Sequence, residues 1–180
     1  MNIVYEYSHL GGIEIMKVRY PGIWASVYSV ISRIKPVRTK ISREKTMPGR
    51  ALVSPTDMNK QFRAHFDRLG FKELKDQYSI QLSSDQPIIK GCFKQIDYAK
   101  DKVLIEVQFG KYAFMFYDMA KFQYFFNESK ADVGIEIVPC HNLYKSMSSG
   151  VSYGEQLIND IERLKRHFPA VPVAVLLIDE

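Results

Sequence analysis

The 180-residue sequence predicts one domain of the α/β or α+β class, in which helices flank a central mixed β-sheet. Its length falls within the ~100–200 residues of a typical domain, and no repeat or linker divides residues 1–180. Helical and strand-like patterns alternate along the chain, as in folds that cover a sheet with helices. The apolar run Val171 to Ile178 is typical of a strand covered on both faces.

The N-terminal part of the chain predicts a strand and a helix. Residues 3–7 have the pattern of a short strand, and Gly11-Gly12 predict the turn after it. From Pro21 onward, apolar side chains recur at helical spacing, which predicts a helix with one buried face. Pro36 ends this helix, because a helix rarely continues past the residue before a proline.

A second helix has clear boundary signals. Ser54 is a suitable N-cap, Pro55 occupies the first helical position, and Asp57 places a carboxylate at the positive helix end. Gly70 supplies the C-terminal stop. We therefore expect a helix between Ser54 and Gly70.

The rest of the chain predicts further strands and two more helices. Strands are expected around residues 78–82, 88–96, 102–109 and 133–138, and helices at about 113–127 and 154–167. A polar loop at 146–150 leads into the last helix. The aromatic side chains of the helix at 113–127 fit either a base-stacking surface or a packed face, and their helical spacing favours packing.

Composition excludes several classes of protein. Hydrophobic residues make up 46% of the chain, which excludes a disordered tail protein. Cys92 and Cys140 alone form neither a disulfide framework nor a four-ligand zinc site, so a reducing cytoplasm is the expected location. No apolar run reaches ~18 residues, so we expect no membrane span. Cys140-His141 suggests a metal ligand or nucleophile, but a loop after Pro139 is favoured.

Most of the positive charge lies in one segment. The formal net charge is +5, and Arg33 to Arg50 carries +6 in 18 residues while the rest of the chain carries −1. A clustered basic segment suggests a polyanion such as nucleic acid, whereas a solvated basic loop is the alternative. The segment lacks an amphipathic period, so it is expected to be a loop or arm.

Two acids in consecutive apolar segments suggest chemistry. Asp97 ends one predicted strand, and Glu106 lies within the apolar strand 103–109, where an unpaired carboxylate is costly to bury. The polar link between them could reverse the chain and bring the two acids together, where a divalent cation relieves their repulsion. The alternative is a turn aspartate and a half-exposed strand glutamate. Glu136, in another apolar strand, could join them, although a structural partner is favoured.

The segment from Ile96 to Phe114 resembles the active-site segment of the BglII- and BstYI-type restriction endonucleases, of the PD-(D/E)XK nuclease superfamily. Further similar stretches occur in the same order nearly end to end: Tyr7–Leu10, Pro21–Trp24, Asp132–Glu136, Met147–Tyr153 with Glu155, and Pro169–Pro172. The resemblance is closer to BstYI than to BglII. It implies the restriction-endonuclease-like fold.

This resemblance implies roles for the acidic segment. Asp97 and Glu106 match the acidic metal ligands, and the backbone carbonyl of Val107 matches a further ligand. Gln108 matches the position of a catalytic Lys in most of the superfamily. Since glutamine cannot act as a base, the metal would form the hydroxide and Gln108 would orient water or substrate.

The resemblance also implies DNA contacts. Lys111 matches a position at the major groove, where BglII has Asn and BstYI has Lys. Ser148 and Ser149 match the recognition loop, where hydroxyl groups contact base edges. Independently of the resemblance, the clustered positive charge predicts phosphate contacts from four residues of the basic segment: Arg38, Lys40, Arg43 and Lys45. Relatives have Glu just after the helix Trp, but this chain has Ala25-Ser26, so any role of that acid is absent or moved.

The function implied is that of a type II restriction endonuclease, a homodimer that uses Mg2+ (or Mn2+) to cut double-stranded DNA. The expected site is RGATCY, cut before the G to leave 5′-GATC overhangs, with AGATCT as the narrower option. Three alternatives remain from the residues: a repair or recombination nuclease of the same superfamily, a non-catalytic DNA-binding regulator, and a plain interaction protein.

Overall fold

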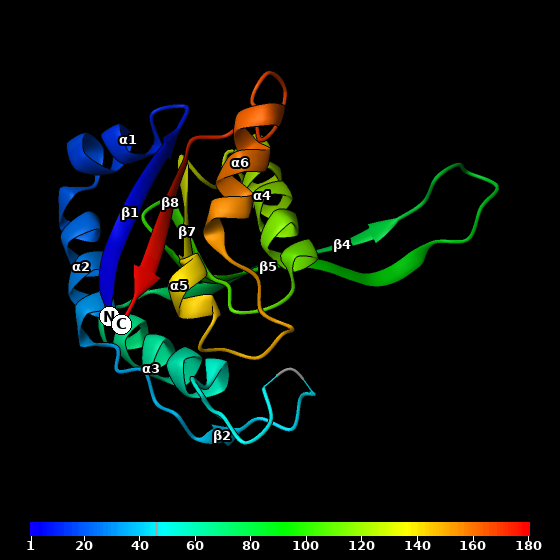
Figure 1. Cartoon of the computed structure of the whole chain (residues 1–180). Helices are drawn as coiled ribbons and strands as arrows, with labels where there is room; N and C mark the ends of the chain where they lie inside the picture. Colours follow the sequence, from blue (N-terminus) through cyan, green and yellow to red (C-terminus); the bar gives the residue numbers. More distant parts are fainter. Residues whose placement is uncertain (46) are drawn as a thin grey trace.

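A computed structural model describes residues 1–45 and 47–180, and it confirms the expected central sheet flanked by helices (Figure 1). The strands are β1 (Asn2–His9), β2 (Lys40–Ile41), β3 (Ala51–Leu52), β4 (Lys72–Ile80), β5 (Ile89–Lys100), β6 (Val103–Val107), β7 (Val133–Pro139) and β8 (Val173–Asp179). The helices are α1 (Gly12–Arg19), α2 (Pro21–Arg33), α3 (Pro55–Arg68), α4 (Tyr112–Asn127), α5 (His141–Tyr144) and α6 (Gly154–Leu164). Thr46, a polar residue of the basic segment, lies outside the described residues.

The main sheet is mixed, as the sequence predicts. Its order is β1-β8-β7-β6-β5-β4, with parallel pairing between β6, β7 and β8 and antiparallel pairing elsewhere. Strands β6, β7 and β8 are buried almost throughout, which fits sequences that are apolar apart from Glu106, Glu136 and Asp179. The sheet therefore has a buried parallel centre that ends in antiparallel strands on both sides.

Helices cover both faces of this sheet (Figure 1). On one face, Phe66 of α3 contacts Tyr98 of β5, with ring centroids 4.7 Å apart. On the other face, α4 approaches β7 so closely that a Cβ on Gly134 would lie 2.6 Å from the Phe122 ring. Only glycine allows that approach, so this position sets the separation between α4 and the sheet.

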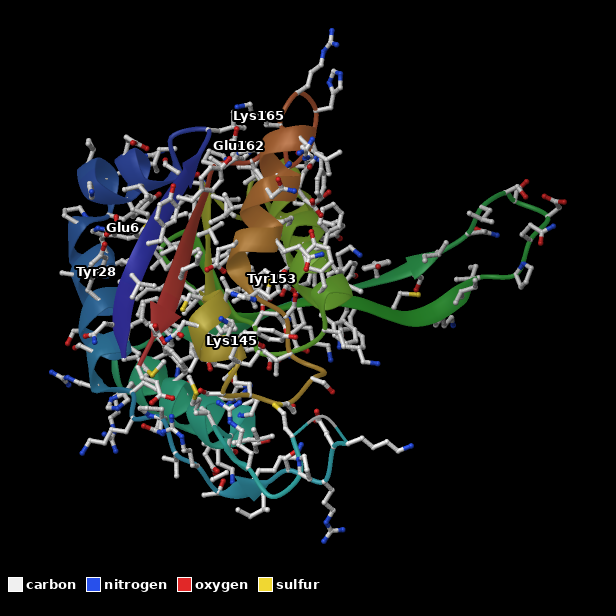
Figure 2. The ribbon with its side chains drawn as sticks, in the orientation of Figure 1. Glu6, Tyr28, Lys145, Tyr153, Glu162 and Lys165 are labelled. Carbon is white, nitrogen blue, oxygen red and sulfur yellow. The ribbon has the colours of Figure 1, made fainter. Side chains whose placement is uncertain are left out.

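The boundary signals of the two long N-terminal helices are confirmed. Helix α2 begins at Pro21, and the Tyr28 hydroxyl donates a hydrogen bond to Glu6, which ties the helix to β1 (Figure 2). Helix α3 begins at Pro55, and the Ser54 side chain accepts a hydrogen bond from the Asp57 backbone N–H at 3.3 Å. Both helices therefore start at the proline that predicts their first turn, and α3 also has its predicted cap.

Three elements differ from the sequence-based expectations. Gly11 does form a turn, with φ of 76°, but the short helix α1 follows at once. Strand β4 begins at Lys72 rather than near residue 78, because pairing with β5 overrides a stretch of polar helix-forming residues. Cys140 does not begin a loop, since its Sγ caps the one-turn helix α5 by accepting a hydrogen bond from the Leu143 N–H.

Strands β4 and β5 continue beyond the body of the molecule as a projecting hairpin (Figure 1). Its outer part carries exposed apolar side chains at Leu82, Ile88 and Ile89. None of the helices in the described residues is long and apolar enough to cross a membrane.

Candidate active site

The reversal expected between Asp97 and Glu106 is a β-hairpin. Tyr98 pairs with Ile105, and the chain turns at Asp101 and Lys102, both of which have positive φ angles. Asp97 and Glu106 are the next residues beyond the Tyr98–Ile105 pair in their strands, so the hairpin brings the two acids together. The sequence prediction of their proximity is confirmed.

Glu106 lies in a strongly unfavourable setting for a carboxylate. It is only 2% exposed and points toward α4 from the centre of the sheet. Burial, followed by the negative charges of Asp118 and Asp97, raises the pKa of Glu106 well above its usual range. Asp97 is partly exposed, so the acid pair has one buried and one accessible member.

Two side chains of α4 complete the surroundings of Glu106. The Lys121 Nζ lies 2.5 Å from a Glu106 oxygen and 2.8 Å from an Asp118 oxygen. Burial alone would lower the pKa of Lys121, but the charges of Glu106 and Asp118 outweigh that effect and raise it. Lys121 is therefore a charged counterion for both buried acids.

Gln108 is held by the same network. Its amide Nε2 donates to Asp118 Oδ2 at 2.8 Å, and its Oε1 accepts from the Gly110 N–H at 3.0 Å. A Cβ on Gly110 would lie 2.6 Å from that oxygen, so glycine makes room for the contact. The amide retains a second N–H and a second lone pair for other partners.

Glu136 of β7 lies directly beside Glu106 in the parallel register. It is completely buried, and neither carboxylate oxygen has a hydrogen-bond partner among the described residues. Burial raises the pKa of Glu136 well above its usual range, and the charges of Asp118 and Glu106 raise it further. The expectation of a structural partner for Glu136 is therefore wrong.

The donor set of this site fits a hard divalent cation. Four acids, Asp97, Glu106, Asp118 and Glu136, influence one another electrostatically, while Lys121 is the cation that contacts two of them. Buried carboxylates without partners are costly unless a cation is near. In the described part of the chain, no three Asp, Glu, His or Cys side chains are already arranged for metal binding.

A basic pocket adjoins Asp97. It has a volume of about 340 Å³ and includes Lys60 and Arg63 on α3, together with Tyr98. A phosphate beside Asp97 would thus meet two cationic side chains. Lys60 and Arg63 were not predicted as binding residues, although they lie about one helical turn apart on the polar face of a helix that follows the basic segment.

A backbone hydrogen bond connects the two segments that carry the predicted recognition residues Lys111, Ser148 and Ser149. Lys111 is exposed and caps α4, and the adjacent Gly110 carbonyl accepts a hydrogen bond from the Ser152 N–H at 2.9 Å. That bond joins the turn after β6 to the serine loop (residues 146–152), in which Ser149 is exposed and Ser148 is partly buried. Lys145 and Tyr153 flank this loop (Figure 2).

The basic segment also contacts the serine loop. Its four predicted DNA-binding residues, Arg38, Lys40, Arg43 and Lys45, are all exposed. Both Glu44 carboxylate oxygens accept from the Ser149 N–H, at 3.2 and 3.3 Å. Arg38 is ion-paired with Glu180, so one of the four cations already has an acidic partner.

A mixed sheet flanked by helices, with an acidic hairpin at its centre, is the restriction-endonuclease-like fold. The profile of the family "Restriction endonuclease BglII/BglIII" matches residues 4–178, so the chain belongs to this family. It is accordingly a type II site-specific deoxyribonuclease.

Solved structures agree with this assignment at the level of the fold. The crystal structure of restriction endonuclease BglII complexed with a DNA 16-mer has a TM-score of 0.76 and 22% identity over all of this chain and 78% of that one. The crystal structure of free BglII has a TM-score of 0.70 and 21% identity over all of this chain and 81% of that one. No curated protein sequence matches the chain.

Proposed function

We propose that the chain is a cytoplasmic, homodimeric type II restriction endonuclease that uses Mg2+ (or Mn2+) to cut double-stranded DNA at RGATCY before the G, leaving 5′-GATC overhangs. AGATCT is the narrower option. The observation that carries the proposal is the β5–β6 hairpin, which brings Asp97 beside Glu106 in a chain of the BglII/BglIII family. The BglII structure that this fold resembles contains a DNA 16-mer, which supports DNA as the substrate.

Asp97, Glu106 and the carbonyl of Val107 would hold the metal ion. Their oxygen donors are the type that Mg2+ and Mn2+ prefer. A metal ion there supplies a water of lowered pKa and stabilises negative charge on the phosphate. The basic pocket formed by Lys60 and Arg63 would bind that phosphate next to Asp97.

Gln108 would position a water molecule or a phosphate oxygen, and it would not transfer protons. Its amide has no basic group, so it cannot take a proton from water. The hydrogen bonds to Asp118 and Gly110 fix the amide plane, and the remaining N–H and lone pair can orient a water molecule or a phosphate oxygen. A fixed amide is useful for this role because its orientation costs no reorganisation during the reaction.

Lys111, Ser148 and Ser149 would read base edges at the outer base pair. Lys111 is exposed at the start of α4, and the Ser152–Gly110 hydrogen bond keeps the serine loop beside it. We expect Lys111→Asn and Ser149→Ala to change the ratio of cutting between AGATCT and GGATCC by about tenfold, with little change in overall DNA affinity. Unchanged ratios across all RGATCY variants would exclude this recognition role.

The homodimer is proposed because a two-fold protein matches a palindrome and each active site cuts one strand. Exposed apolar side chains support it, since Phe114 and Tyr117 on α4 and Leu82 and Phe93 on the hairpin are about half to nearly fully exposed. Such surfaces often mark protein contacts. The cytoplasm is proposed because Cys92 and Cys140 are both free thiols.

The decisive experiment is digestion of DNA of known sequence, followed by sequencing of the cut ends. Purified protein with Mg2+ should give discrete fragments whose 5′ ends begin with GATC, and chelation by EDTA should stop cutting. Random fragments would instead support a repair nuclease, and retained cutting in EDTA would refute the metal dependence.

A further inference from the structure

Two side chains next to Glu106, those of Lys121 and Glu136, have no role in the reaction proposed above. We infer that Lys121 is a displaceable counterion: it occupies Glu106 while no divalent cation is bound, and it moves to Glu136 when a cation takes Glu106. This inference rests on the proposed metal dependence and adds a mechanism by which the site exchanges one cation for another.

Lys121 and a divalent cation would compete for one carboxylate, that of Glu106. The Lys121 Nζ contacts Glu106 at 2.5 Å, and the same Glu106 is the expected metal ligand. The side chain of Glu106 is only 3% exposed, so it has little surface left for a second cation. An ammonium group and a divalent ion at one buried carboxylate repel each other strongly, because screening there is weak.

Glu136 is a neighbouring carboxyl group that could accept the displaced lysine. Glu136 pairs with Glu106 in the register of β6 and β7, and neighbouring strands lie about 4.8 Å apart. Both Glu136 oxygens are buried without a hydrogen-bond partner in the described part of the chain. Lysine carries its charge on a flexible four-carbon stem, so a rotation about its side-chain bonds can carry Nζ from one acid to the next.

Asp118 and Gln108 can keep their positions when the lysine moves. Asp118 contacts Lys121 through Oδ1 and holds Gln108 through Oδ2. Its position is therefore fixed by Gln108 as well as by the lysine. Moving Nζ toward Glu136 frees Glu106 for a metal ion while the Asp118–Gln108 hydrogen bond remains available.

A double-mutant cycle tests this exchange through metal affinity, measured by Mn2+ titration with electron paramagnetic resonance in the absence of DNA. Lys121→Met removes the competing cation and should tighten Mn2+ binding by about tenfold. Glu136→Gln removes the receiving carboxylate and should weaken it by about tenfold. In the Lys121→Met background, Glu136→Gln should change affinity by less than about twofold, because no lysine remains to be received.

Lys130→Met is the matched control, because Lys130 also pairs with a carboxylate next to α4, Asp76, which accepts a hydrogen bond from Tyr124, but has no ion pair with the four acids around Glu106. It should leave Mn2+ affinity within about twofold of the parent. Should Lys121→Met fail to fold, Lys121→Gln must show the same tightening.

Three results would overturn the inference. Weaker binding in Lys121→Met would mean that the lysine organises the acids instead of competing. Equal weakening of Mn2+ binding by Glu136→Gln in both backgrounds would mean that Glu136 acts on the metal directly. Unchanged Mn2+ binding in Glu136→Gln alone would mean that Glu136 does not accept the Lys121 ammonium group. A parent protein that binds no Mn2+ would instead contradict the proposed metal dependence.

Discussion

Glu106 and Glu136 differ in whether a cation contacts their carboxyl group. Glu106 has Lys121 at 2.5 Å, whereas Glu136, one strand away, has no hydrogen-bond partner among the described residues. Burial raises the pKa of both glutamates well above the usual range, but only Glu106 has, among the described residues, a directly bonded cation that opposes this effect. The two neighbouring glutamates should therefore respond differently to substitution by glutamine.

Glu106→Gln and Asp97→Ala should each lower Mg2+-dependent cleavage by more than about 100-fold, since even substitutions behind a metal ligand cost 10- to 100-fold. DNA affinity, measured by fluorescence anisotropy in Ca2+, should remain. Glu128→Gln, at an exposed position after α4, is the control and should cut normally. Full activity of either active-site variant would contradict the metal assignment.

Glu136→Gln should stabilise the metal-free protein in a pH-dependent way. The native pKa of Glu136 lies well above its ordinary value of 4.5, so the native state binds more protons than the unfolded state above that pH. Wild-type stability therefore falls as the pH rises from about 4.5 toward the native pKa, at about 1.4 kcal/mol per unit of pKa difference. Glutamine removes this loss.

Thermal melting in EDTA at pH 4 and pH 8 tests this expectation. The melting temperature of Glu136→Gln should exceed that of the wild type at pH 8 by several degrees, about 2–4 °C for each kcal/mol, and the gain should shrink toward pH 4. A gain that is equal at both pH values would show that packing, and not ionisation, is responsible.

At the level of elements, α3 begins where its cap dictates and carries the basic pocket that adjoins Asp97. Ser54→Ala removes the side-chain acceptor for the Asp57 N–H and should cost about 1 kcal/mol. The expected decrease in melting temperature is about 2–4 °C. Ser79→Ala, at an exposed position on β4, should leave it unchanged, and an equal loss in both variants would exclude the cap as the cause.

The sequence predicts elements best where side chains mark both periodicity and boundaries. Helix α3 has a cap, a proline and a glycine stop, and its observed start agrees with them. Strand β4 lacks such boundary signals. The composition of Lys72 to Gln77 is typical of a polar helix, and the segment forms a strand only through pairing with β5. Local propensity cannot reveal that partner.

The same contrast applies to the candidate site. Asp97 and Glu106 lie nine residues apart around one turn, so the chain itself implies their proximity. Asp118 and Lys121 come from a helix that packs across the sheet, and sequence spacing does not place them beside Glu106. One signal was available: these two charges stand three residues apart within a helix of mostly aromatic and apolar side chains.

At the level of the whole molecule, a dimer should account for the exposed apolar surface. Light scattering should give twice the 20.9 kDa mass of one chain. Phe114→Asp combined with Tyr117→Asp should shift the mass to that of one chain and abolish double-strand cutting, because a buried unpaired charge opposes association. Leu164→Asp, an exposed apolar position at the end of α6, should remain dimeric. A dimeric double variant would exclude α4 from the contact.

The pairing of β1 with β8 has a consequence for how the molecule is made. Asn2 pairs with Asp179, so the first strand must wait for the last before its backbone groups are satisfied. At about 5–20 residues per second, ribosomal synthesis would hold that first strand without its partner for roughly 10–35 s. Contacts of such long sequence separation also slow folding. Completion of the sheet, and with it the support behind the acidic hairpin, is therefore a late event in the life of each chain.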